Sequence, residues 1–183
     1  MPTLVHDFDW PDRFVVGTIG VPGARTFYLQ VRAGAQLISF VLEKQQSADL
    51  AEKIDEILDE LRSLEGNPYS VPISTPIELV DNEPLEPAHE QFRIGIMSLG
   101  WDPTSAQIIL EAYPVTIVDA EDEFSLEQDS GEADEVLRVR IPVGAARAFA
   151  KRTREVVGAG RPACPLCGFP MDPDGHVCTL PEV

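Results

Sequence analysis

The chain has 183 residues, of which 25% are charged, and a formal net charge of −17 at pH 7. A chain this acidic is repelled by nucleic-acid phosphates and by anionic membrane surfaces, which argues against both kinds of partner. No apolar run approaches the ~20 residues that cross a bilayer, and the first nine residues have neither the basic nor the apolar region of a signal peptide. We therefore expect a cytoplasmic protein with one main domain and a small appendage.

The first half of the chain, about residues 1–66, predicts three strands followed by a helix. Residues 13–19, 26–31 and 36–42 are rich in β-branched and aromatic residues, and glycine and proline punctuate them. Apolar residues then recur at helical spacing over residues 47–64, and Gly66 stands where a C-cap glycine belongs. The short connections between the strands predict an antiparallel meander.

The second half, about residues 88–157, repeats this plan. Strands are predicted at 92–99, 107–113 and 136–141, and a helix at 143–157. Residues 67–87 contain five prolines and predict an irregular crossover, whereas the acidic residues 121–135 predict a solvated loop. The expected fold of residues 1–157 is thus α+β: an antiparallel sheet with two packed helices, in pseudo-duplicated halves of strands then helix.

The helix at 143–157 carries a cluster of basic residues. Arg147, Lys151, Arg152 and Arg154 fall within two turns, opposite an apolar stripe. We expect this basic face to meet a protein partner or the acidic residues 119–135 of the same chain. The total charge and the lack of aromatic residues between the basic ones argue against a nucleic-acid partner.

The tail, residues 163–183, contains all three cysteines of the chain. Cys164 and Cys167 are separated by two residues, and Gly168 follows, as in a metal-binding knuckle. His176 and Cys178, one residue apart, complete a Cys₃His set that is typical of a closed, structural Zn²⁺ site. A segment of about twenty residues cannot bury a core of its own, so we expect zinc binding to fold this tail.

Two alternatives stay open at this tail. Asp172 or Asp174 could replace His176 as the fourth zinc ligand. A redox dithiol would need a helix after the Cys-x-x-Cys pair, and residues 168–170 (Gly-Phe-Pro) prevent one.

Four segments together resemble a known family. They are residues 13–30 (RFVVGTIGVPGARTFYLQ), 42–46 (LEKQQ), 92–102 (FRIGIMSLGWD) and 164–178 (CPLCGFPMDPDGHVC). In this order they are similar to the actinobacterial family catalogued as domain of unknown function 3090. The resemblance covers nearly the whole chain and implies a cytoplasmic protein, but the family brings no activity with it.

Two functions are compatible with these patterns. The first is a zinc-binding, non-enzymatic module that docks a protein partner, and the alternative is an enzyme or enzyme subunit with a site between the two halves. Polar side chains that interrupt or follow the apolar strands would form such a site: Arg25, Tyr28, Gln30, Glu43, Lys44 and Gln46. A concave pocket that collects these residues would favour the alternative.

Overall fold

The computed structural model describes residues 3–21, 23–87, 89–115, 135–159 and residue 166. Within them it has strands β1 (Leu4–Asp9), β2 (Arg13–Ile19), β3 (Thr26–Ala33), β4 (Gln36–Leu42), β5 (His89–Asp102), β6 (Gln107–Pro114) and β7 (Glu135–Pro142). The helices are α1 (Lys44–Arg62), α2 (Val143–Gly158) and the 3-10 turn η1 (Ile77–Leu79). None of these helices combines the length and the apolar character that a membrane crossing requires.

Seven strands form one mixed sheet in the order β1-β7-β6-β5-β4-β3-β2. Each half of the chain contributes an antiparallel meander, β2–β3–β4 or β5–β6–β7, and a helix follows each meander. The prediction of an α+β fold is confirmed, but the prediction of an antiparallel sheet is wrong at two pairings. The β4–β5 and β1–β7 pairs are parallel. The first follows from α1, because a helical crossover returns the chain to the end of the sheet at which the previous strand began.

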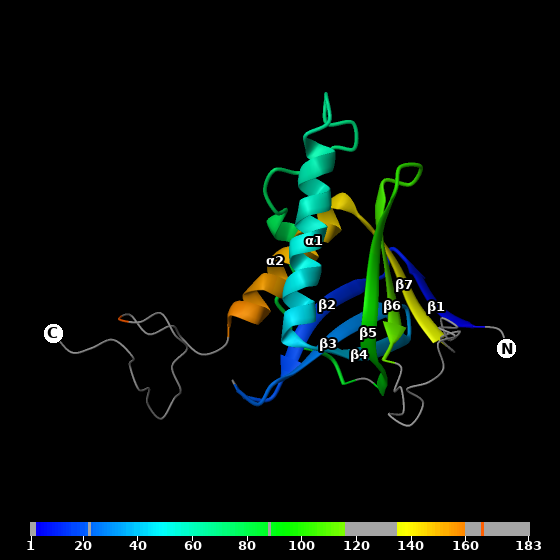
Figure 1. Ribbon diagram of the computed structural model, residues 1–183, viewed down its shortest axis with the longest axis vertical. Helices are drawn as coiled ribbons and strands as arrows, with labels where there is room; N and C mark the ends of the chain where they lie inside the picture. The colour runs from blue at the N-terminus through cyan, green and yellow to red at the C-terminus, as the bar shows by residue number, and fades with distance from the viewer. Residues whose placement is uncertain (1–2, 22, 88, 116–134, 160–165, 167–183) are drawn as a thin grey trace, which may run out of the picture.

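Strand β5 belongs to both meanders. Its first residues pair with β4, up to Arg93, and the residues from Ile94 onward pair with β6. Figure 1 shows the result: β5, β6 and β7 stand upright in the view, β2, β3 and β4 lie across it, and both helices lie on one side. The two halves are therefore held together by one continuous strand.

The core lies between the curved sheet and the helices. Phe40 and Leu29 of the first meander and Leu137 of the second are fully buried, as are Ile54 and Leu58 of α1. Two pairs of aromatic rings pack in the core. Phe40 of β4 meets Phe92 of the neighbouring strand β5 edge-on at 4.7 Å between centroids, and Phe149 of α2 stacks on Phe14 of β2 at 4.3 Å, which joins helix to sheet. The apolar face predicted for each helix is buried, with Leu50, Ile54 and Leu58 in α1 and with Ala146, Phe149 and Ala150 in α2.

Residues 67–87, the crossover segment, are tied to β2 and β3 by hydrogen bonds. The Arg13 Nε donates to Asp81 Oδ2 at 2.6 Å, and its Nη2 donates to the carbonyl oxygens of Glu83 and Pro84 at 2.8 and 2.9 Å. Burial raises the pKa of Asp81, but the hydrogen bond from Arg13 and that from the backbone of Glu83 outweigh it and leave the pKa below its usual value. Apart from η1, the segment has no regular secondary structure, yet it is firmly attached.

Gly17 and Gln30 complete this attachment. A Cβ at Gly17 would lie 2.5 Å from Cγ of Leu85, so only glycine lets the crossover segment approach β2 this closely. The buried Gln30 side chain donates to the carbonyl of Glu86 and accepts from its backbone N–H, at 2.7 and 2.9 Å. Gln30 therefore pairs with the backbone of the crossover segment as a further strand would.

Two of the four basic residues predicted to form an exposed face on α2, Arg147 and Arg152, turn inward, whereas Lys151 and Arg154 are exposed. Arg147, 7% exposed, donates to Asp55 and Asp59 of α1 at 2.7 and 2.6 Å. Arg152, 6% exposed, donates to the carbonyl of Val16 at 3.0 Å. The acidic counterpart in the described part of the chain is therefore α1 and the crossover segment. Residues 119–134, in which the counterpart was predicted, lie outside the described residues.

Replacing Arg147 tests whether this basic residue is structural. Arg147→Leu leaves the buried Asp55 with Arg154 as its one remaining ion-pair partner among the described residues, at 2.6 Å. Breaking a buried pair from one side leaves a partly compensated charge, so we expect the free energy of unfolding to fall by about 3 kcal/mol. Urea unfolding measures it. Lys53→Gln removes an exposed ion pair on α1, the helix that carries Asp55, and should leave the urea midpoint unchanged. Equal midpoints for both variants would contradict the structural role.

Candidate functional site

The largest hollow near the predicted residues lies where the two halves meet, and we call it the junction pocket. Its volume is about 580 Å³. Five pieces of the chain line it: the start of β3, the end of β4, the start of α1, Arg93 of β5 and the end of α2. The lining residues are Gly23, Arg25, Thr26, Phe27, Val41, Leu42, Glu43, Lys44, Arg93, Val157 and Gly158.

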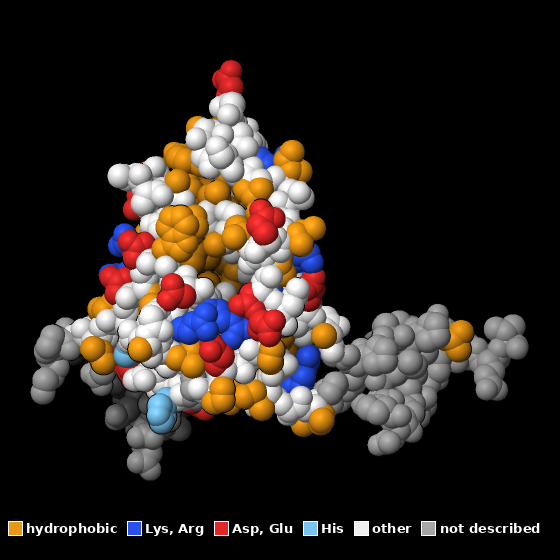
Figure 2. Space-filling model, turned by 180° about the vertical axis from the view of Figure 1, so that it is seen from behind, with side chains coloured by type: hydrophobic (Ala, Val, Ile, Leu, Met, Phe, Trp, Pro, Cys, Tyr) orange, Lys and Arg blue, Asp and Glu red, His pale blue; other side chains and the backbone are white. Residues whose placement is uncertain are grey.

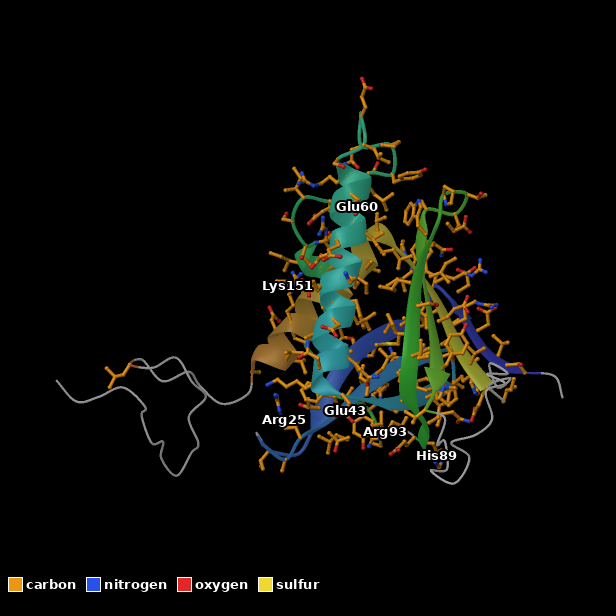
Figure 3. The ribbon with its side chains drawn as sticks, viewed as in Figure 1. Arg25, Glu43, Glu60, His89, Arg93 and Lys151 are labelled. Carbon is orange, nitrogen blue, oxygen red and sulfur yellow. The ribbon has the colours of Figure 1, made fainter. Side chains whose placement is uncertain are left out.

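Three of the six residues predicted for a site between the halves line this pocket. They are Arg25, Glu43 and Lys44. Figure 3 shows Arg25, Glu43 and Arg93 at the same end of the molecule, below the start of α1, whereas Lys151 and Glu60 lie farther along the helices. The structure thus brings together half of the predicted set and adds Arg93 from the second half.

Glu43 stands at the N-cap of α1, directly after β4. Its side chain accepts from the backbone N–H of Gln46, and the Gln46 side chain accepts from the backbone N–H of Glu43 at 2.7 Å, which is a capping box. The Glu43 carboxylate also accepts from Arg93 Nη1 at 2.8 Å. The first turn of α1 is therefore already capped by a carboxylate of the chain itself, and the positive charge available to a ligand is that of the side chains.

Gln46 does not line the pocket but supports Arg93. The β5–β6 register shifts between Ile94 and Met97, a bulge that leaves backbone carbonyls without ladder partners. The amide nitrogen of Gln46 donates to two of them, those of Ile94 and Gly95, at 3.1 and 2.9 Å. One glutamine thus caps α1 and fixes the bulge that follows Arg93, so we regard it as a positioning residue.

Arg25 forms the opposite wall. Its Nη1 donates to the carbonyl of Val156 in the last turn of α2 at 3.1 Å, where a cation is favourable at a helix C-terminus. Its guanidinium also lies over the ring of Phe27, 5.0 Å from the centroid. Arg25 therefore joins the first half of the chain to α2 while it faces the pocket.

The charge of the lining is opposite in sign to that of the chain. Arg25, Lys44 and Arg93 stand against one carboxylate, that of Glu43, so the lining carries a net charge of +2 in a chain of −17. Lys44 is exposed at the pocket edge, and Arg93 is 52% exposed at its side chain. Thr26 adds a hydroxyl group to the lining, and Phe27, Val41, Leu42 and Val157 are its apolar side chains.

Tyr28 and Gln30 lie elsewhere. Successive side chains of a strand point to opposite faces, so these two residues project to the other side of β3 from Phe27. The Gln30 side chain is hydrogen-bonded to the backbone of the crossover segment, and its amide nitrogen also donates to Ser39 Oγ at 3.0 Å. Of the six polar residues selected from the sequence, Tyr28, Gln30 and Gln46 therefore do not line the junction pocket.

Arg93 was missed because nothing in its own segment marks it as functional. It is the single basic residue in a strand that otherwise reads FRIGIMSL. A single basic residue in an apolar strand was the one feature of the sequence that could have pointed to Arg93. Arg93 reaches the pocket because it pairs with Val41 of the parallel strand β4, and this pairing cannot be read from the strand pattern.

The predicted zinc ligands, Cys164, Cys167, His176 and Cys178, lie outside the described residues, and so do the alternatives Asp172 and Asp174. Among the residues that the structure does describe, no group of three or more His, Cys, Asp and Glu side chains is placed to hold a metal ion.

Comparison with known proteins identifies the family. The family model described as "Protein of unknown function (DUF3090)" matches residues 6–178. The chain belongs to this family, and the resemblance seen in the sequence is confirmed. No curated protein and no solved structure matches the chain.

Gln46→Ala tests the positioning role of this glutamine. The variant loses one capping bond and two bonds to bulge carbonyls, so we expect the free energy of unfolding to fall by about 1–3 kcal/mol. Chemical unfolding measures the loss. Gln45→Ala on the same helical turn is the matched control, because Gln45 bonds only to Asp49 on the helix surface. A Gln46→Ala variant as stable as Gln45→Ala would show that the bulge holds without it.

Proposed function

We propose that this member of the family binds a small anionic molecule in the junction pocket. The observation that supports the proposal is the excess of positive charge on the pocket lining of a strongly acidic chain. Because the −17 charge repels anions at most of the surface, a concave site with a local +2 is where one would be held. Its volume of about 580 Å³ lies in the range of ligand pockets, roughly 300–1,000 Å³.

The two sides of the pocket indicate the chemistry of the ligand. Arg25, Lys44 and Arg93 offer charge-assisted donors to a carboxylate, sulfonate or phosphate group. Phe27, Leu42 and Val157 offer an apolar wall to the remainder of the molecule. We therefore propose an amphipathic acid, with its anionic group toward Arg93 and its apolar part toward Phe27.

Binding is proposed rather than covalent catalysis. The described lining contains no Ser, Cys or His, and its one hydroxyl side chain, Thr26, has no histidine beside it to act as a base. Glu43 is engaged by Arg93 and by the first turn of α1. The alternative function, an enzyme with a site between the two halves, would use this same pocket, because the pocket lies between the halves.

We further propose that Cys164, Cys167, His176 and Cys178 hold a structural Zn²⁺. The support is the chemistry of the donor set, which suits tetrahedral zinc. Thiolate ligands of this kind persist in a reducing compartment, so a cytoplasmic location is part of the proposal. Gly158 lines the junction pocket, and the segment that carries the zinc ligands begins a few residues later, so the ion would fold the chain that follows the pocket.

The fluorescent probe 8-anilinonaphthalene-1-sulfonate tests the pocket, since it combines a sulfonate with aromatic rings. We expect the protein to bind it and Arg93→Gln to weaken binding about tenfold, the loss of one charge-assisted hydrogen bond. Titration calorimetry measures both affinities. Arg62→Gln, at the far end of α1, removes the same charge away from the pocket and should leave the affinity unchanged. Equal losses in the two variants would reduce the effect to net charge and contradict the proposal.

The zinc proposal is tested by elemental analysis of protein from zinc-replete medium. We expect one zinc per chain, and none after Cys164→Ser with Cys167→Ser. His176→Ala should lose the metal, whereas loss with Asp172→Ala or Asp174→Ala instead would assign the fourth ligand to an aspartate. Chelation should leave the far-ultraviolet circular dichroism of the body intact. Metal-free protein with three reactive thiols would overturn the site.

A further inference from the structure

A second surface, unrelated to the junction pocket, surrounds Trp10. The indole is 68% exposed, and it stands at the mouth of a hollow of about 190 Å³. Leu79, 50% exposed, lines the same hollow, and Ile77, two residues earlier, is 83% exposed. From behind, the described body exposes a group of hydrophobic side chains above a band in which basic side chains are flanked by acidic ones (Figure 2). We call Trp10, Leu79, Ile77 and the hollow the Trp10 surface.

The backbone holds Trp10 in this exposed place. Its φ of 52° lies in the left-handed region, where a bulky side chain is strained. The backbone N–H of Trp10 donates to the carbonyl of Arg140 at 2.8 Å, and Pro11 follows, so the indole is presented from a fixed turn. Strain of this kind clusters at functional sites, and burial does not account for it here because the side chain faces solvent.

The hollow combines apolar walls with charged residues, of which Arg13, Asp81 and Arg152 are paired with one another. Phe14, Ile141, Ala145 and Phe149 form its walls. The guanidinium groups of Arg13 and Arg152 both meet the Asp81 carboxylate, at 2.6 and 3.5 Å. At about 190 Å³ the hollow is smaller than the usual ligand pocket, roughly 300–1,000 Å³, which favours a single side chain as its occupant.

We propose that the Trp10 surface docks a segment of a partner protein in which a large apolar side chain is flanked by lysine or arginine. Tryptophan beside a pocket is the usual anchor of a protein interface. The exposed acids Asp9 and Asp12 flank Trp10, and the exposed Glu78 precedes Leu79, so a basic segment complements the rim. The charge of −17 disfavours a second copy of the chain, a nucleic acid or an anionic membrane on this surface.

The experiment uses the full chain and two synthetic helical peptides of equal positive charge. One carries leucine on one face and lysine on the other, and in the second every leucine is alanine. We expect the leucine peptide to bind at least tenfold more tightly, measured by fluorescence anisotropy, and more weakly at high salt. Trp10→Gly removes the indole and suits the positive φ. In this variant the affinity for the leucine peptide should fall to that for the alanine peptide, and the melting temperature of the protein should not fall.

Leu79→Ser should independently weaken binding of the leucine peptide. Ile19→Ser, which replaces an exposed apolar residue elsewhere on the surface, should leave that binding unchanged. Unchanged affinity in Trp10→Gly, or equal affinity for both peptides, would overturn the proposal. A dimer in sedimentation that Trp10→Gly abolishes would assign the surface to a second copy. Binding to phosphatidylglycerol vesicles that Trp10→Gly abolishes would assign it to a membrane, and either result would overturn it as well.

Discussion

The continuity of β5 is the constraint on which the rest of the structure depends. Its first residues pair with the first meander and its later residues begin the second, so neither meander can shift without moving the other. The bulge at Gly95 allows the change of partner, and a Cβ there would lie 3.0 Å from the Cα of Val115. Gln46 restrains the same bulge from α1. Arg93 stands immediately before it, which explains why a pocket forms at this point of contact between the halves.

The local elements could be predicted from the sequence because their signals are local. The bounds of β2, β4 and α2 agree with the periodicity to within a residue, and the proline-rich crossover is irregular apart from η1. Strand β1 was missed, because LVHDFD offers little apolar alternation and its partner β7 lies more than a hundred residues away. The parallel pairings could not be predicted either, since a strand pattern carries no direction.

The basic residues of α2 show where pattern reasoning fails for a physical reason. Periodicity assigns arginine to the exposed face because a lone buried charge is expensive. Arg147 and Arg152 avoid that penalty by meeting Asp55, Asp59 and Asp81, which come from other elements. Of the six polar residues selected from the sequence, Arg25, Glu43 and Lys44 line the junction pocket. Tyr28 and Gln30 lie on the face of β3 opposite to Phe27, and the crossover segment covers Gln30 there. The sequence does not reveal this contact because it forms only in the tertiary structure.

Helix α2 connects the two surfaces described above. Its first half, through Ala145 and Phe149, forms a wall of the Trp10 surface, and its last residues, Val157 and Gly158, line the junction pocket. The guanidinium groups of Arg147 and Arg152 hold the helix to α1 and to the edge of β2. A ligand at one end and a partner at the other would therefore contact the same rigid element.

The pairing of β1 with β7 has a consequence for the order in which the chain is built. Leu4 of β1 pairs with Glu135 of β7, so during synthesis β1 cannot pair until β7 has been made. At roughly 5–20 residues per second, that interval is on the order of ten seconds. The strand pairings within the first meander, β2 with β3 and β3 with β4, join residues that are near in sequence and can form meanwhile. Strand β1, with the turn that presents Trp10, takes its place only after the ribosome has delivered β7, so the N-terminus is among the last parts of the body to be ordered.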